Sequence, residues 1–117
     1  MVTESADPAP GEAPSCSSEQ LESAVRVLEG RWKVLIIYRL FTAPTLRFSE
    51  LQRLIPGISQ KMLIQQLRDL EANGIVSRTI HPVVPPRVDY ALTEDGRGLL
   101  PALRELQTWA ASRTTPA

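Results

Sequence analysis

The fold is decided by residues 49–92, which read SELQRLIPGISQKMLIQQLRDLEANGIVSRTIHPVVPPRVDYAL. Ser49 opens a capping-box pattern that predicts a short helix ending at Pro56-Gly57. Ser59 is a good N-cap for a second helix, which should run to Asn73-Gly74 because this pair favours a left-handed stop. The stretch therefore begins with two helices joined by a tight turn.

Two β-rich runs complete the stretch. Residues 75–81 and 87–92 favour strands, and the intervening PVVPP excludes helix and predicts a hairpin tip. A short helix, a turn, a polar-faced helix and a hairpin form the layout of a winged helix-turn-helix, in which the second helix enters the DNA major groove. We therefore predict a mainly α-helical fold with a small β-hairpin, a winged helix-turn-helix.

Further helices are predicted on both sides of this stretch. Ser17 starts a capping box for a first helix that ends at Gly30. Residues 31–43 are apolar around most of a helix surface, which predicts a buried central helix. Thr93 should cap a last helix, and Pro101 well inside it should kink the chain.

The N-terminal residues show no periodic apolar pattern. Residues 1–15 carry three prolines among small and acidic residues, so we expect a disordered tail. Residues 16–113 are then expected to form one DNA-binding domain, with dimerisation helices at both ends.

The charges of the chain are segregated although 13 Lys and Arg balance 13 Asp and Glu. Residues 1–30 hold one basic and six acidic residues, whereas residues 31–87 hold nine basic and three acidic residues. A basic central segment suits a polyanionic partner such as DNA. Ordinary scatter of surface charges is the alternative explanation.

The sequence lacks the residues that several classes of function require. Because the chain has one cysteine, it can form neither an internal disulfide nor a Cys-rich metal site. One histidine also argues against zinc chemistry or a catalytic Ser-His or Cys-His pair. We expect no enzyme activity, no metal and no cofactor. The longest aliphatic run, residues 34–37, is far shorter than the ~20 residues of a membrane span, so we expect a soluble cytoplasmic protein with no membrane partner.

Five ordered blocks of the sequence resemble the HxlR-type winged helix-turn-helix transcriptional regulators of bacteria. The resemblance covers roughly residues 16–110, and its blocks are GRWKVL (30–35), RFSEL (47–51), PGISQKML (56–63), LRDLEANG (67–74) and PPRVDYALT (85–93). It implies a homodimer, joined through its first and last helices, that binds double-stranded operator DNA and regulates transcription. It identifies neither the operator nor a small-molecule effector.

The resemblance also draws attention to Cys16. In some members of this family a cysteine close to the first helix senses oxidants or electrophiles. Cys16 lies about one helical turn further from Trp32 than that pattern places it, and Glu19 stands at the matching position. Cys16 is therefore either a redox sensor or an incidental cysteine of the tail.

The helix that follows Ser59 carries a polar face opposite its leucine stripe. Glutamine can pair with adenine and lysine can donate to guanine, while an aliphatic side chain fits a thymine methyl group. A solvated polar face without a partner is the alternative. The residues that we expect to contact DNA from this helix are Ser59, Gln60, Lys61, Ile64, Gln65 and Arg68.

Three arginines near the predicted strands are candidates for phosphate or minor-groove contacts, namely Arg47, Arg78 and Arg87. Arg87 follows Pro85-Pro86 and is the stronger candidate in the wing. Arg78 falls on the same strand face as Val76 and Ile80, so packing over the core and pairing with an acid is an alternative for it.

The first and last helices carry more apolar surface than one packing face requires. We predict that a second copy of the chain covers the excess. The predicted interface consists of Leu21, Val25, Leu28, Leu99, Leu100, Leu103, Leu106 and Trp109.

A winged helix can also dock another protein without binding DNA, because fold alone does not determine function. The zero net charge is compatible with this alternative, and the basic central segment argues against it. Phosphate neutralisation makes DNA affinity fall steeply with salt, whereas an apolar protein interface responds weakly. A salt titration would therefore separate the two functions.

Overall fold

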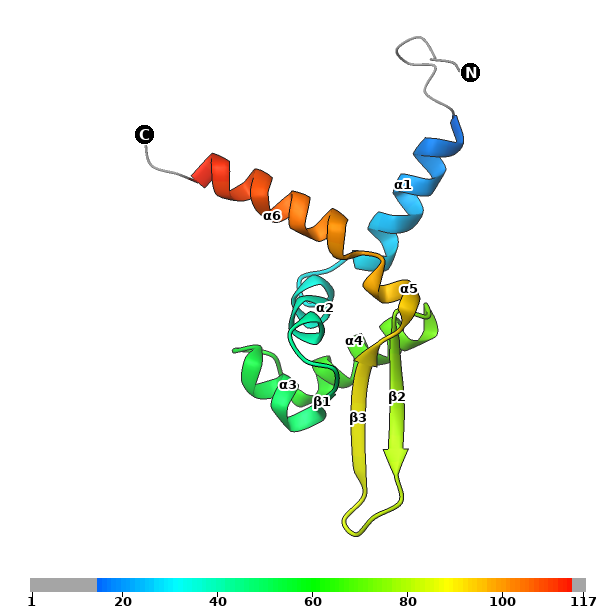
Figure 1. Ribbon diagram of the computed structural model, residues 1–117, viewed down its shortest axis with the longest axis vertical. Coiled ribbons are helices and arrows are strands. Elements are labelled where there is room, and N and C mark those ends of the chain that lie inside the picture. Colours follow the sequence, from blue (N-terminus) through cyan, green and yellow to red (C-terminus); the bar gives the residue numbers. More distant parts are fainter. Residues whose placement is uncertain (1–14, 115–117) are drawn as a thin grey trace.

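The computed structural model describes residues 15–114 and has the predicted winged helix-turn-helix fold (Figure 1). Six helices and a three-stranded antiparallel sheet occupy the described range. The elements are α1 (Ser15–Leu28), α2 (Lys33–Phe41), β1 (Leu46–Arg47), α3 (Phe48–Leu54), α4 (Gln60–Ala72), β2 (Val76–His81), β3 (Arg87–Leu92), α5 (Glu94–Arg97) and α6 (Leu100–Thr114). Residues 1–14 of the predicted tail lie outside the described residues.

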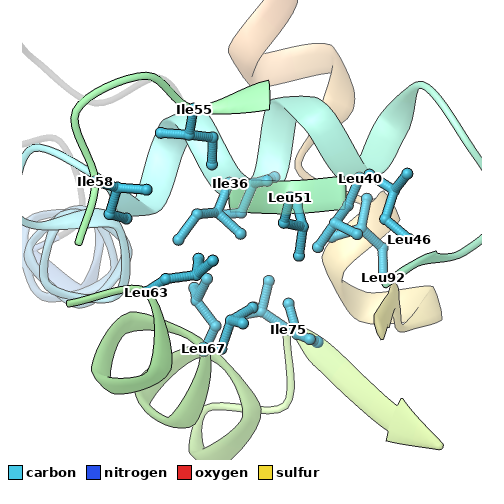
Figure 2. Packing of buried hydrophobic residues seen from close by; sticks show 13 residues of the cluster. Ile36, Leu40, Leu46, Leu51, Ile55, Ile58, Leu63, Leu67, Ile75 and Leu92 are labelled. Carbon is cyan, nitrogen blue, oxygen red and sulfur yellow. The ribbon is translucent and has the colours of Figure 1, made fainter. Parts of the chain in front are cut away.

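The core lies between α2, α4 and the base of the sheet. Ile36 of α2 faces Leu63 and Leu67 of α4, Leu40 lies beside Leu46 and Leu92, and all of these side chains are buried (Figure 2). Each such side chain contributes roughly 1.5–3 kcal/mol when it leaves water. The predicted leucine stripe of α4 is buried, and the opposite face of α4 is left outward. The predicted burial of α2 holds for Ile36, Ile37 and Leu40 but not for Leu35 and Tyr38, which are exposed.

The sheet has the strand order β1-β3-β2, with the hairpin strands β2 and β3 as predicted. The sequence does not predict β1, because a strand of two residues is too short to show an alternation of apolar and polar side chains. The pairing of Leu46 with Tyr90, and of Arg78 with Tyr90, places these three side chains on one face of the sheet. Arg47 pairs with Asp89 and therefore lies on the other face.

The caps of α4 and α5 are those expected from the sequence. The Ser59 hydroxyl accepts a hydrogen bond from the Met62 N–H at 3.0 Å, and the Thr93 hydroxyl accepts one from Gly96 at 3.0 Å. Gly74 follows α4 with φ +75°, the left-handed conformation that favours glycine. The helix that should read DNA is therefore fixed at both ends by its own sequence.

Two predicted helix starts are wrong. α1 begins at Ser15, two residues before the predicted cap Ser17. α3 begins at Phe48 with Arg47 as N-cap, because the Glu50 carboxylate accepts the Arg47 N–H at 2.7 Å. A carboxylate binds this N–H more strongly than a neutral side chain does, so the acid at the third position determines the start.

The predicted kink at Pro101 is also wrong. The last segment consists of two helices, α5 and α6, which are separated at Gly98. Pro101 is the second residue of α6. The N–H groups of the first turn make no hydrogen bond within the helix, so the missing N–H of proline costs nothing there. The proline therefore helps to start a new helix, and α6 projects from the body on the same side as α1 (Figure 1).

Candidate nucleic-acid interface

The outward face of α4 forms a shallow depression at the surface. It is lined by Gln60, Lys61, Ile64, Gln65 and Arg68, all of which were predicted to contact DNA. The four polar side chains are exposed and Ile64 is half-buried. Ser59 accepts the capping hydrogen bond, so its hydroxyl is already engaged with the helix start.

A groove of about 290 Å³ runs between α4 and the sheet, and its lining includes Arg68, Glu71, Arg78 and Tyr90. Arg78 Nε lies 3.6 Å from Glu71 Oε2, which is the pairing with an acid that the sequence left open. Burial raises the pKa of the Tyr90 phenol above its ordinary value, and the charge of Arg78 partly opposes this shift. Tyr90 is therefore a neutral hydrogen-bonding group in this groove at neutral pH.

The other face of the sheet carries a second group of charges around Asp89. His81 Nε2 lies 2.9 Å from Asp89 Oδ2, and Arg87 Nε lies 3.5 Å from Asp89 Oδ1. Arg47 shares this face because it pairs with Asp89 in the sheet register. Asp89, which the sequence did not single out, thus contacts His81 and Arg87, the two residues that flank the wing tip.

The structure therefore divides the three arginines predicted to contact phosphates. Arg78 lies in the groove beside α4, whereas Arg47 and Arg87 lie on the opposite face of the sheet. A second hollow, between the start of α3 and the wing tip, is lined by Arg47 and Arg87 together with Ser49. Sequence spacing alone does not reveal this division, since it depends on the strand register.

The residues predicted for a dimer interface fall into two groups. Leu21 and Val25 of α1 and Leu106 and Trp109 of α6 are more than half exposed. The remaining four are half-buried, and three of them pack against the core, namely Leu28, Leu99 and Leu103, while Leu100 lines a groove between α2 and α6.

The groove between α2 and α6 has a volume of about 460 Å³ and an apolar lining. Leu35 and Tyr38 of α2 contribute to it and are exposed, as is Leu106 on the α6 side. The exposed apolar surface at this end of the molecule therefore extends from α6 onto α2, which the sequence did not indicate.

Cys16 is the second residue of α1, so it belongs to the helix and not to a preceding tail. Within residues 15–114, no three His, Cys, Asp or Glu side chains are grouped so that they could hold a metal ion. No helix of this part of the chain has the length and apolar character that a membrane crossing requires.

Comparisons with known proteins agree with this architecture. The family model described as HxlR-like helix-turn-helix matches residues 27–117. The HTH-type transcriptional regulator YkvN of Bacillus subtilis is 52% identical over 88 residues, which cover 75% of this chain and 74% of YkvN.

Solved structures of transcriptional regulators resemble the chain as well. The reduced form of YodB from B. subtilis is 43% identical with a TM-score of 0.75, and the match covers 84% of this chain and 95% of YodB. The redox regulator HypR in its reduced form is 42% identical with a TM-score of 0.76, over 80% of this chain and 91% of HypR.

Proposed function

Since the chain belongs to the HxlR-like helix-turn-helix family, we propose that it regulates transcription as a homodimer bound to a pseudo-palindromic DNA operator. Its relatives are HTH-type transcriptional regulators, so the chain is a DNA-binding regulator, and such regulators are not enzymes. Its partners are then double-stranded DNA and a second copy of itself. Because it acts on chromosomal DNA, we place it in the cytoplasm.

The proposed mode of DNA binding rests on one observation: α4 has a polar outward face opposite a fully buried leucine stripe. Gln60, Lys61 and Gln65 stand at or near the N-terminal half of α4, where side chains of a groove-bound helix come closest to base edges. We assign base contacts to these three residues. Ile64 is assigned to a thymine methyl group or a sugar, and Arg68 to the DNA backbone beside the major groove.

The proposed roles of the three arginines follow from their different environments. Arg47 and Arg87 line the hollow beside the wing tip, and we assign them to phosphates or to the minor groove. Arg78 is engaged by Glu71 and is assigned to a phosphate next to α4. These contacts position the protein and carry little sequence information.

The proposed dimer rests on the exposed apolar residues of α1 and α6. Leu21, Val25, Leu106 and Trp109 would form a sticky surface on a monomer. Pairing the two helices across a two-fold axis would bury them, together with the exposed parts of Leu100 and Leu103. The same axis would impose symmetry on the operator, with half-sites about 34–36 Å apart or a multiple of this distance.

We predict that α4 reads the sequence while Arg87 strengthens binding to any DNA. Gln60→Ala or Gln65→Ala should cost ~1–3 kcal/mol on the best operator and relax the preference at particular base pairs. Arg87→Ala should weaken binding to all duplexes alike and reduce the slope of log affinity against log salt by about one. Titration of operator and random duplexes at several salt concentrations measures both effects. A changed base preference in Arg87→Ala, with unchanged preferences in both glutamine variants, would refute the assignment.

We also predict that operator binding responds little to oxidants. HypR is a redox regulator, and Cys16 is the only cysteine with which this chain could act similarly. Cys16 is displaced by about one helical turn from the family position, and Glu19 and Glu22 disfavour a thiolate nearby. Diamide should therefore change the operator affinity of wild type and of Cys16→Ser equally little. A large loss of affinity that a reductant reverses, and that Cys16→Ser does not show, would establish Cys16 as a sensor.

A further inference from the structure

The helix α4 is held on one flank by a lysine from α2. Lys33 Nζ donates a hydrogen bond to Gln66 Oε1 at 2.9 Å and lies 3.4 Å from Asp69 Oδ2. Gln66 and Asp69 are three residues apart on α4, so one ammonium group binds two successive positions along the same side of the helix. The Lys33 side chain is only 12% exposed, and its charge is therefore committed to this contact.

A second polar contact holds the opposite flank of α4. At 100° per residue, Gln66 and Asp69 lie to one side of the buried leucine stripe, and Glu71 lies to the other side. Glu71 pairs with Arg78 of β2. This second pair is longer, at 3.6 Å, and both of its side chains are more exposed than Lys33. The contact from Lys33 is therefore the tighter of the two.

These contacts add to the restraint that the core places on α4. Leu63, Leu67 and Leu70 oppose a large rotation of α4, which would expose them, whereas directional polar contacts also oppose a small one. Hydrogen bonds weaken steeply when their angle or length changes. A rotation of α4 about its axis would stretch the bonds from Lys33, and it would also swing Lys61 and Gln65, which lie opposite the leucine stripe.

Lys33 also stands at the point where the proposed dimer helix meets the helix-turn-helix. It is the first residue of α2, directly after the junction that leaves α1. In that junction the guanidinium of Arg31 lies 4.4 Å from the centre of the Trp32 ring, and Trp32 packs beside Gly57 in the turn between α3 and α4. Residues 31–33 therefore contact the turn and the second helix of the helix-turn-helix from one short segment.

We propose that Lys33 is a positioning residue that sets the rotation of α4, and thereby the base preference of the regulator, without contacting DNA. This inference rests on the proposed function of α4 in reading bases. A residue in this role should affect binding to the preferred sequence far more than binding to DNA in general. A phosphate contact would affect both alike.

The test uses the full-length chain and two duplexes. One duplex is selected by the wild-type protein from a random pool, and the other is a scrambled version of equal length and composition. Lys33→Met keeps the apolar stem and removes the hydrogen bonds, and Gln66→Leu removes the nearer acceptor. Lys33→Met should lower affinity for the selected duplex about tenfold, and change affinity for the scrambled duplex less than about twofold.

The double variant provides the sharper criterion. Because Lys33→Met already removes the contact with Gln66, the double variant Lys33→Met with Gln66→Leu should bind the selected duplex about as well as Lys33→Met alone. Arg97→Met, which removes one positive charge from α5, serves as the control and should retain the wild-type ratio of the two affinities. Thermal unfolding of each sample identifies loss of fold. Should Lys33→Met not fold, Gln66→Leu and Asp69→Asn remain, and both should lower the ratio.

Three results would overturn the inference. The first is a wild-type ratio of affinities in Lys33→Met, the second is an equal loss of both affinities with a smaller salt slope, and the third is full additivity of Lys33→Met and Gln66→Leu. Each of these leaves the proposed function intact. A wild-type protein that selects no preferred duplex would instead refute the proposed function, and the inference would fall with it.

Discussion

Replacing Leu106 with aspartate is expected to produce a monomer that has lost most of its operator affinity. Leu106 is 57% exposed on α6, so a charge there costs the isolated fold little. In an apolar interface the same carboxylate would be buried without a partner, which costs several kcal/mol, about enough to dissociate a dimer. A monomer then binds a single half-site, and loss of the second protomer's contacts should lower operator affinity at least about a hundredfold.

Sedimentation and operator titration measure the two effects on the same samples. Thr108→Asp is the matched control, because it places the same charge two residues away on the other side of α6. It should remain dimeric and bind normally. Leu103→Asp also charges the predicted interface, but Leu103 packs against the core, so that variant mixes dissociation with unfolding. A Leu106→Asp protein that stays dimeric, or that binds the operator like wild type, would contradict the proposed interface.

Replacing Gly96 with alanine should destabilise the fold more than any exposed substitution. Gly96 is buried in α5, and a Cβ atom at this position would overlap the carbonyl oxygen of Ile75. That oxygen belongs to the backbone and accepts the Thr93 N–H at 3.0 Å, so it cannot move without breaking the link between the sheet and α5. We expect a loss of roughly 3 kcal/mol in the free energy of unfolding. Thermal unfolding should show a midpoint lower by more than about 10 °C.

Gly98→Ala is the control for this substitution. Gly98 has a helical backbone with φ −63°, and a Cβ atom there would lie 3.2 Å from the nearest atom, the Asp95 oxygen. A small adjustment accommodates it, and the loss of glycine stiffens the unfolded chain. The change in the free energy of unfolding should stay within about 1 kcal/mol. Equal destabilisation by the two alanines would mean that the Ile75 contact is not the cause.

The parts of the fold that were predicted correctly are those with local signals. Ser59 and Gly74 mark the two ends of α4, and the prolines of residues 82–86 separate the two hairpin strands. The break between α5 and α6 was missed because Thr93 and the acidic residues after it mark a single helix start, whereas the leucine stripe begins only at Leu99, after Gly98. The close approach of Gly96 to Ile75 joins residues 21 positions apart, and no local pattern encodes it.

In the candidate site, too, the features with local signals were predicted and the tertiary contacts were not. The polar face of α4 was predicted because helical periodicity alone places Lys61 and Gln65 opposite the leucines. The partners that restrain the charged residues were not predicted. Asp89 meets His81 and Arg87 only through the register of the hairpin, and Lys33 meets Gln66 only through the packing of α2 on α4. Such contacts depend on tertiary structure, which sequence spacing does not specify.

Selection of bound duplexes by the wild-type protein tests the central claim most directly. Fragments of the source genome, or a random pool, are bound at a salt concentration that suppresses non-specific binding, recovered and sequenced. The account predicts an enriched pseudo-palindrome whose half-site centres lie about one helical turn, ~34–36 Å, or a multiple of it apart. Base preferences within each half-site should weaken in Gln60→Ala and Gln65→Ala. Recovery of no enriched sequence, or of a single half-site bound by a monomer as tightly as the complete site, would contradict the account.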